Sequence, residues 1–167
     1  TTVYGIEPAN VGVASYYRNT IVHFFINKAI IELAFIAIAE YSEFEPDQQV
    51  EALFWAEVLE LRDLFKFEFF YPPTETFQAE IAAELDRIDD SWRQELATGV
   101  KGARRLLAMM TPHVAHMTLQ MYVESYSIAA DLLANLEASE TIDESDFVDR
   151  CMTYGKQALL QRRISSE

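Results

Sequence analysis

The sequence predicts an all-α fold, an array of about five to six helices with little or no β-structure. Apolar residues recur every three or four positions through most of the 167 residues, which is the period of an amphipathic helix. Five glycines and five prolines divide the chain into segments long enough for helices. No stretch keeps the period-two alternation of a half-buried strand. Half of the residues are hydrophobic, which is enough for a single helical domain over residues 1–167.

The first helix is predicted over residues 14–41, ahead of a break at 43–46. Its charged residues fall within an arc of about 120°: Arg18, Lys28, Glu32 and Glu40. Lys28 and Glu32 are four positions apart, so they can form an ion pair. Nearly everything else is apolar, and we therefore expect a helix that is wet along one narrow strip and buried elsewhere. Its uncharged run 33–39 is far shorter than the roughly twenty apolar residues of a membrane span.

Two further helices are predicted on either side of Pro72 and Pro73. The second, over residues 47–70, has apolar residues on one face: Val50, Leu53, Phe54, Val58, Leu61 and Phe65. The two prolines stop it, because proline lacks an N–H group and restricts the residue before it. The third runs over 75–88 with Thr74 as its N-cap, and its inward residues are Phe77, Ile81 and Leu85.

Residues 89–101 are expected to form a connecting loop anchored by Trp92. A fourth helical segment begins near Gly102, and Pro112 either kinks it or starts a new helix. Beyond it, two apolar stripes predict burial on two sides: Met117, Met121, Ser125, Ile128, Leu132 and Leu136, and then Tyr122, Tyr126, Ala129 and Leu133. The last helix follows a capping box from Thr141 to Glu144. Its inward residues are Phe147, Cys151, Tyr154, Ala158 and Leu159.

Acidic residues are concentrated in the middle of the chain. The formal net charge is −14, of which residues 40–90 supply −12, with fifteen acidic and three basic residues. Residues 1–39 are neutral, and residues 91–167 carry −2. A protein this acidic repels phosphates, which argues against a nucleic-acid partner. The lone Cys151 cannot form an internal disulfide.

A stripe of uncharged polar residues follows the first helix at Asn19, His23 and Asn27. Buried polar groups need hydrogen-bond partners, so we expect the stripe to lock this helix to a neighbour or to a connecting loop. A catalytic His23 would need an orienting acid and a nucleophile or substrate within reach, and the sequence offers no local candidate. The structural interpretation is therefore favoured over catalysis.

No other group of residues amounts to an active site. His113 and His116 are three apart on one helix face, but zinc would need two more ligands, so ordinary hydrogen-bonding histidines are expected. Cys151 is expected to be a packed thiol rather than a nucleophile. The chain has no Gly-x-Ser-x-Gly and no glycine-rich phosphate loop. We expect no catalytic residue, no metal ligand and no cofactor in this chain.

The basic residues Lys101, Arg104 and Arg105 stand next to an apolar run that ends at Met110. Such a stretch can rest on an anionic membrane, to which each base contributes about 1 kcal/mol. The alternative, a solvated start of a helix, is favoured.

Three segments, in chain order, resemble one known family. Residues 14–25 read ASYYRNTIVHFF, residues 61–71 read LRDLFKFEFFY, and residues 154–165 read YGKQALLQRRIS. The first, which contains Tyr17, Arg18, Asn19 and His23, resembles a segment that follows the catalytic domain of bacterial and mitochondrial glycerol-3-phosphate acyltransferases. The other two are similar to later segments of the same proteins, and the linking residues resemble those of actinobacterial members.

The resemblance implies a carboxy-terminal helical region of a membrane-bound enzyme. That family transfers an acyl group from acyl carrier protein or coenzyme A to the 1-hydroxyl of glycerol 3-phosphate. Its general base is a histidine followed five positions later by an aspartate. Here Lys28, Thr118 and Met121 stand five positions after the three histidines. The resemblance therefore implies that the catalytic residues, the acyl donor site and the glycerol 3-phosphate site lie outside these residues.

The resemblance thus predicts a piece of a larger polypeptide that supports its own acyltransferase domain at the cytoplasmic face of the cell membrane. Tyr17, Arg18, Asn19, His23 and Asn27 are the candidate structural or interdomain residues. Lys101, Arg104 and Arg105 are the candidate membrane contacts. The alternative is a free-standing helical protein that binds an acyl chain or a partner helix. An excised domain should expose an apolar patch on its first helix, whereas a free-standing protein should cover it.

Overall fold

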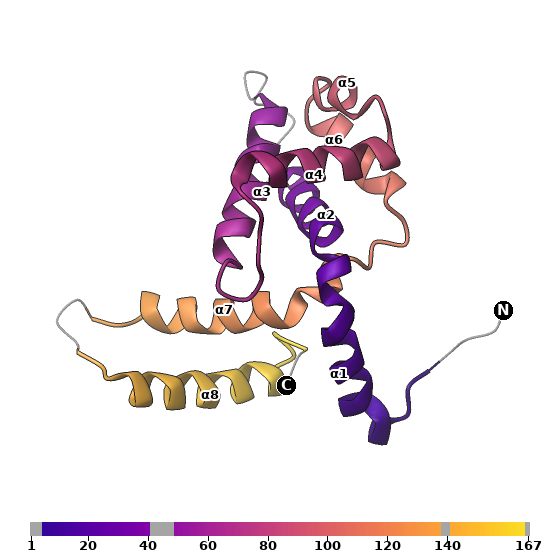
Figure 1. Cartoon of the computed structure of the whole chain (residues 1–167). Helices are drawn as coiled ribbons and strands as arrows, with labels where there is room; N and C mark the ends of the chain where they lie inside the picture. The colour runs from indigo at the N-terminus through magenta and orange to yellow at the C-terminus, as the bar shows by residue number, and fades with distance from the viewer. Residues whose placement is uncertain (1–4, 41–48, 138–140, 166–167) are drawn as a thin grey trace. The chain divides into compact units, whose positions relative to one another are not determined.

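A computed structural model describes residues 5–40, 49–137 and 141–165, without the side chains of Pro8, Val11, Ser15, Arg18 and Asn19. These residues form helices, turns and irregular segments and contain no strand, which confirms the all-α prediction (Figure 1). The α-helices are α1 (Val11–Ile21), α2 (Ile26–Ala39), α3 (Val50–Leu64), α4 (Thr74–Ile88), α5 (Trp92–Leu96), α6 (Val100–Met109), α7 (Gln120–Ala134) and α8 (Glu144–Leu160). Three short 3-10 helices are η1 (Pro8–Asn10), η2 (Val22–Phe24) and η3 (His116–Thr118).

The chain divides into two compact units, Thr1–Thr118 and Leu119–Glu167. Each is described by itself below, and the expected single domain stays a prediction. None of the described helices is both long and apolar enough to cross a membrane.

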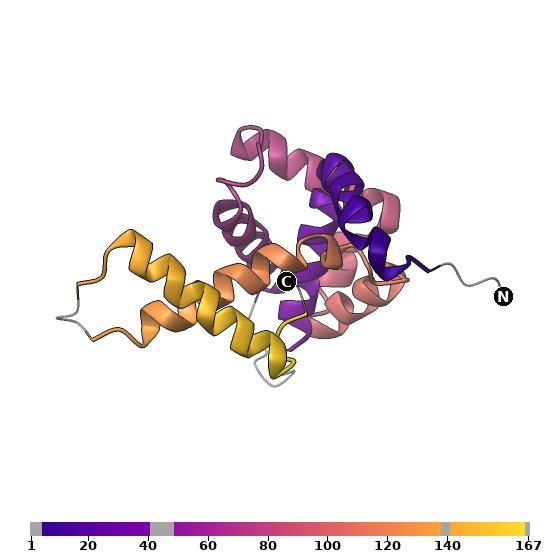
Figure 2. The same cartoon turned by 90° about the horizontal axis from the view of Figure 1, so that it is seen from below.

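Helix α2 is the centre of the first unit (Figures 1 and 2). It contacts α3, α4, α6 and η3, and these neighbours cover most of its circumference. Its buried apolar residues are Ile26, Ala29, Ile30, Ile31, Ala34, Phe35 and Ile38. A helix that is apolar nearly all round is stable in water only when other elements surround it. The predicted long first helix is instead two helices, because η2 interrupts it at Val22–Phe24.

Aromatic side chains join α2 to α3 and α5. The Phe35 ring stacks on the Phe54 ring with centroids 4.9 Å apart, and Trp92 lies 6.4 Å from Phe54 and 6.2 Å from Trp55. The buried Trp92 indole donates a hydrogen bond to Asp86 at 2.8 Å. Trp92 thus anchors its segment, as predicted, although that segment also contains the short helix α5. Gly99 ends the connection with φ +84°, a conformation that favours glycine.

The ends of α3 and α4 differ slightly from the prediction. Helix α3 ends at Leu64 rather than at residue 70, and turns lead from there to the two prolines. Phe77, Ile81 and Leu85 of α4 are fully buried, which confirms its predicted inward face. Thr74 is the first residue of α4 rather than its N-cap, and no side chain caps this end. The predicted break at 43–46 lies outside the described residues.

In the second unit, α7 and α8 lie side by side and run in opposite directions (Figures 1 and 2). Ile128 and Ala158 are their buried residues. Of the second predicted stripe of α7, Tyr122, Tyr126 and Ala129 are half-buried and Leu133 is 56% exposed. Asp143, not Thr141, caps α8: its carboxylate accepts a hydrogen bond from the Asp146 N–H at 2.9 Å.

Candidate functional site

Several exposed apolar side chains lie on α1, on η2 and at the residue that follows η2, and we call this surface the α1–η2 face. Its exposed apolar residues are Val13, Tyr16, Tyr17, Ile21, Phe24 and Phe25. Phe24 is 75% exposed and Tyr17 is 65% exposed. Helix α1 makes its main contacts with the neighbouring short elements η1 and η2 and projects from the start of α2 (Figure 1). The expected burial of the first helix outside its wet strip is therefore right for α2 and wrong for α1.

The predicted interdomain residues fall at the start of the first unit. Tyr17 contacts Tyr16 edge to face, with ring centroids 5.7 Å apart. His23 is exposed, and its ring lies 4.0 Å from that of Phe24. The side chains of Arg18 and Asn19 lie outside the described residues.

Asn27 joins its helix to a neighbouring helix, as expected for the polar stripe. Its side-chain amide donates a hydrogen bond to Glu80 Oε2 at 3.2 Å, which links α2 to α4. The His23 side chain, by contrast, is exposed. Of these two residues, His23 lies on the exposed apolar side and Asn27 lies on the side that faces α4.

Glu32 and His116 form a buried contact that the sequence analysis missed. Glu32 has no exposed surface, and its Oε2 accepts a hydrogen bond from the His116 backbone N–H at 2.7 Å. His116 Nδ1 lies 2.8 Å from the same oxygen, and since a carboxylate oxygen accepts, this ring nitrogen carries the hydrogen. Glu32 Oε1 is buried without a partner in the described part of the chain. The contact fixes the segment after α6 against α2.

This pair corrects two expectations. Glu32 was placed on the wet strip with Lys28 as its partner, but it turns inward to His116 instead. The physical reason is that α2 is surrounded, so a carboxylate on its circumference faces a neighbouring segment rather than water. One sequence signal was available: a histidine has a ring N–H group that can donate a hydrogen bond to a buried acid. Its distance of 84 residues from Glu32 hid the pairing.

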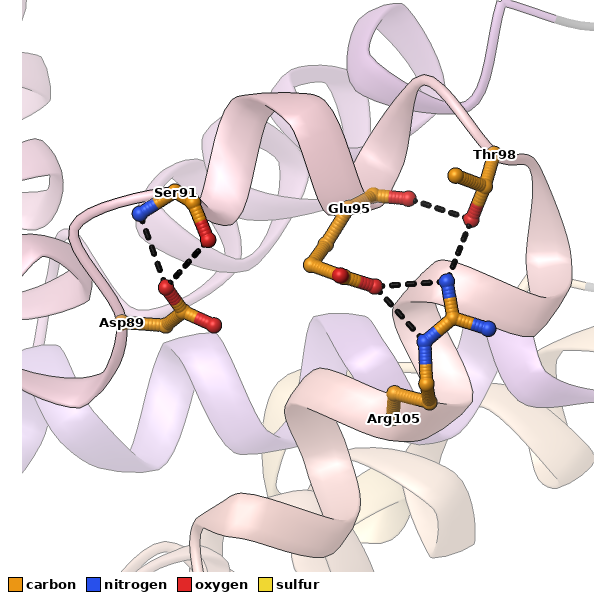
Figure 3. A network of polar contacts seen from close by, with 5 residues as sticks. All are labelled: Asp89, Ser91, Glu95, Thr98 and Arg105. Atoms are coloured by element: carbon orange, nitrogen blue, oxygen red, sulfur yellow. Dashed lines mark hydrogen bonds and ion pairs between the residues drawn. The ribbon is translucent and has the colours of Figure 1, made fainter.

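The basic residues of α6 hold the first unit together. Arg104 donates from Nε and Nη2 to the Ala39 carbonyl, at 3.1 and 2.8 Å, and so satisfies the C-terminal end of α2. Arg105 binds Glu95 through Nε at 2.7 Å and donates to the Thr98 hydroxyl at 2.8 Å (Figure 3). Lys101 is exposed. Arg104 and Arg105, two of the predicted membrane contacts, therefore bind groups within the fold.

The same close-up contains a second turn, which fixes the start of α5 (Figure 3). Asp89 Oδ1 accepts hydrogen bonds from the Ser91 hydroxyl at 2.6 Å and from its N–H at 2.8 Å. These two bonds lower the pKa of the Asp89 carboxyl. Asp89 and Arg105 thus serve the local fold on either side of α5.

The segment 61–71 bends the chain from α3 towards α4. Arg62 donates to the Pro72 carbonyl at 3.0 Å, and its guanidinium lies 5.7 Å from the Tyr71 ring centre and 5.6 Å from that of Phe77. Burial raises the pKa of the Tyr71 hydroxyl. Phe67 and Phe70, by contrast, are exposed. The charged and aromatic residues of this segment therefore serve the fold first.

The second unit contains the segment 154–165 and an apolar groove. Tyr154 and Arg163 both bind Asp131 of α7, at 3.1 and 3.0 Å. The groove between α7 and α8 has a volume of about 430 Å³, and the half-buried Cys151 lines it together with Glu124 and others. Nowhere in the described residues do three His, Cys, Asp or Glu side chains gather in a way that could hold a metal ion.

The described parts thus define an all-helical protein whose identifiable polar contacts serve the fold and whose first helix has several exposed apolar residues. A family profile for the glycerol-3-phosphate acyltransferase C-terminal region matches residues 1–167. The chain belongs to this family.

The chain is also similar to three mycobacterial proteins, each named "Putative acyltransferase plsB1". They come from Mycobacterium bovis and from two strains of Mycobacterium tuberculosis. Each is 35% identical over 164 residues, which cover 98% of this chain and 26% of the relative. The chain therefore spans about a quarter of the length of these relatives. No solved structure matches it significantly.

Proposed function

We propose that this chain is the non-catalytic helical domain of a glycerol-3-phosphate 1-O-acyltransferase and that it braces the acyltransferase domain of the same polypeptide. The family match supports the assignment, as do the relatives, which are named acyltransferases and are much longer than this chain. The reaction would pass an acyl group from acyl carrier protein or coenzyme A to glycerol 3-phosphate, an early step of phospholipid biosynthesis. None of the three histidines in this chain has an aspartate five positions later, so the proposal assigns the chemistry to the other domain.

The α1–η2 face carries this proposal. Exposed apolar side chains that gather on one surface are typical of an interface, because water contact with them is unfavourable. Aromatic residues are enriched at the centre of protein interfaces, and this face contains Tyr16, Tyr17, Phe24 and Phe25. Because the matched family is a C-terminal region, the rest of such a protein precedes it in sequence. The α1–η2 face is therefore the first surface after the preceding domain.

The test mixes the 167-residue chain with a separately expressed acyltransferase domain and measures binding and acyl transfer. We expect the chain alone to transfer no acyl group, and we expect it to bind that domain or increase its activity. Phe24→Ser should weaken the binding at least tenfold, because truncating a central aromatic residue of an interface costs about 2 kcal/mol or more. Phe67→Ser is the matched control, since Phe67 is at least as exposed as Phe24 and lies outside the α1–η2 face. Acyl transfer by the chain alone would contradict the proposal.

We also propose that the parent protein works at the cytoplasmic face of the cell membrane, as a peripheral or monotopic protein. The candidate contacts are Lys101, Arg104 and Arg105, three basic residues at the start of α6 that are all exposed. Vesicle co-sedimentation tests this part: binding should rise with the content of anionic lipid and fall with Lys101→Gln. Binding that ignores anionic lipid would remove the direct contact and leave the interdomain role unaffected.

The alternative of a free-standing binding protein has less support, because the chain spans only about a quarter of each relative. Light scattering separates the two. An excised domain should self-associate or bind detergent through the α1–η2 face, and a free-standing protein should be monomeric with or without detergent.

A further inference from the structure

A small apolar pocket lies in the first unit, between the start of α2 and the segment that follows α6. Its volume is about 200 Å³, somewhat more than the roughly 150 Å³ of an engineered cavity that binds benzene. Val22, Phe25, Met110, Val114 and Ala115 are among the residues that form its apolar wall. A pocket of this size can hold several carbons of an alkyl chain, while the exposed side chains of Phe25 and Val114 extend the apolar surface beyond it.

The pocket has one cationic group. Its lining includes two polar side chains, Lys28 and Thr118, and the Thr118 hydroxyl donates to the Ala115 carbonyl at 2.7 Å. Glu32, the acid four positions after Lys28, is turned away and binds His116. The two lining segments, residues 21–28 and 110–118, contain no acidic residue at all. Lys28, half-buried in an acidic protein, therefore has no ion-pair partner in the described part of the chain.

A second observation is that the pocket is held in shape. The segment 110–118 forms one of its walls, and the hydrogen bonds from His116 to Glu32 fix this segment on α2. Pre-formed pockets bind with less loss of conformational freedom than those that must be assembled.

From these observations we infer that the pocket binds a single-chain anionic amphiphile, with the end of its alkyl chain against Phe25 and Met110 and its carboxylate or phosphate head on the Lys28 ammonium. The apolar wall selects the chain, and the uncompensated amine selects a negative head group. The groove between α7 and α8 differs in this respect, since its lining includes both Lys156 and the carboxylate of Glu124. The pocket shares Ile21 and Phe25 with the α1–η2 face, but titration of the chain alone tests it in the absence of the acyltransferase domain.

Isothermal titration of the 167-residue chain tests the inference with three probes below their micelle concentrations: dodecanoate, dodecyl phosphate and the uncharged dodecyl maltoside. Both anions should bind about tenfold more tightly than the maltoside, which is the effect of one charge-assisted contact of about 1.4 kcal/mol. Tighter binding of dodecanoate would indicate a fatty acid as the natural ligand, and tighter binding of dodecyl phosphate would indicate an acyl phosphate lipid. Equal affinity for charged and uncharged probes would overturn the inference. Absence of any binding would also overturn it and would indicate that the pocket receives an apolar side chain of a partner domain.

Variants assign the binding to this pocket. Lys28→Met should abolish the preference for anions, and Lys156→Met, its matched control in the second unit, should leave it unchanged. Val114→Asp adds a carboxylate to the wall at a half-exposed position, so it should weaken anion binding with the fold intact. If Lys156→Met removes the preference while Lys28→Met and Val114→Asp keep it, the site is in the other groove and the inference is wrong.

Discussion

The buried contact between Glu32 and His116 predicts a large and specific loss of stability when it is removed. Glu32 is fully buried, and one of its oxygens accepts both hydrogen bonds from His116, at 2.7 and 2.8 Å. The perturbation is Glu32→Ala, which removes the acceptor and leaves two donors of His116 without their partner. A second variant, His116→Ala, keeps the backbone donor and removes the ring.

The magnitude follows from burial and from the number of bonds. A hydrogen bond to a charged group contributes about 1.5–3 kcal/mol, and two are lost in Glu32→Ala. The His116 side chain is 31% exposed, so water replaces part of the lost bonding on that side. We therefore expect a decrease of about 2–4 kcal/mol in the free energy of unfolding. His116→Ala should cost a similar amount, about 2–4 kcal/mol, because it leaves a buried carboxylate with one donor.

The assay is urea unfolding followed by tryptophan fluorescence. Both tryptophans of the chain, Trp55 and Trp92, lie in the first unit, so their emission reports the unit that contains the pair. Glu80→Ala is the matched control: Glu80 is exposed and accepts one hydrogen bond, from Asn27 at 3.2 Å, so its loss should cost less than about 1 kcal/mol. The double variant of Glu32 and His116 should lose about 1–2 kcal/mol less free energy of unfolding than the two single variants added together, because each single variant breaks the same contact. Strict additivity, or a Glu32→Ala no more costly than the control, would refute the reasoning.

Three further predictions concern other parts of the fold. Gly102→Ala would place its Cβ 1.7 Å from the backbone oxygen of Glu95, so thermal unfolding should show a loss of more than about 2 kcal/mol. Arg104→Gln removes the guanidinium from the Ala39 carbonyl and should cost about 1 kcal/mol in urea unfolding, and an unchanged midpoint would contradict that bond. Hydrogen bonds from the Asp146 N–H and then from Ser145 lower the pKa of the Asp143 carboxyl. The stabilisation of α8 by Asp143 is therefore complete above the unfolded-state pKa and is lost as the pH falls through the folded-state pKa. In acid titrations followed by circular dichroism, Asp143→Asn should remove this part of the pH dependence and keep the cap.

Local periodicity predicted those parts of the fold that depend on neighbours in sequence. The three inward residues of α4 could be found because positions three and four apart share one face of a helix. The interruption at η2 could not, since Val22–Phe24 contains no glycine or proline that would mark a break. Likewise, Asp143 rather than Thr141 caps α8, because several residues in that segment can act as a cap and geometry selects among them.

In the candidate site, too, features set by neighbours in sequence could be predicted and contacts between distant segments could not. The family resemblance drew attention to residues 14–25, and the structure adds that the apolar residues there are exposed rather than buried. Contacts between distant segments were beyond the sequence: Glu32 with His116, and Arg104 with the end of α2. Each brings together side chains whose separation in the chain carries no periodic signal.

Amide hydrogen exchange tests the central claim, that the α1–η2 face contacts the acyltransferase domain, most directly. Exchange would be measured for the 167-residue chain alone and after addition of the separately expressed acyltransferase domain. The account predicts slower exchange in α1 and η2, residues 11–24, on addition of that domain, and no such protection in the Phe24→Ser variant. Unchanged exchange in α1 and η2 when the two proteins are bound would contradict it.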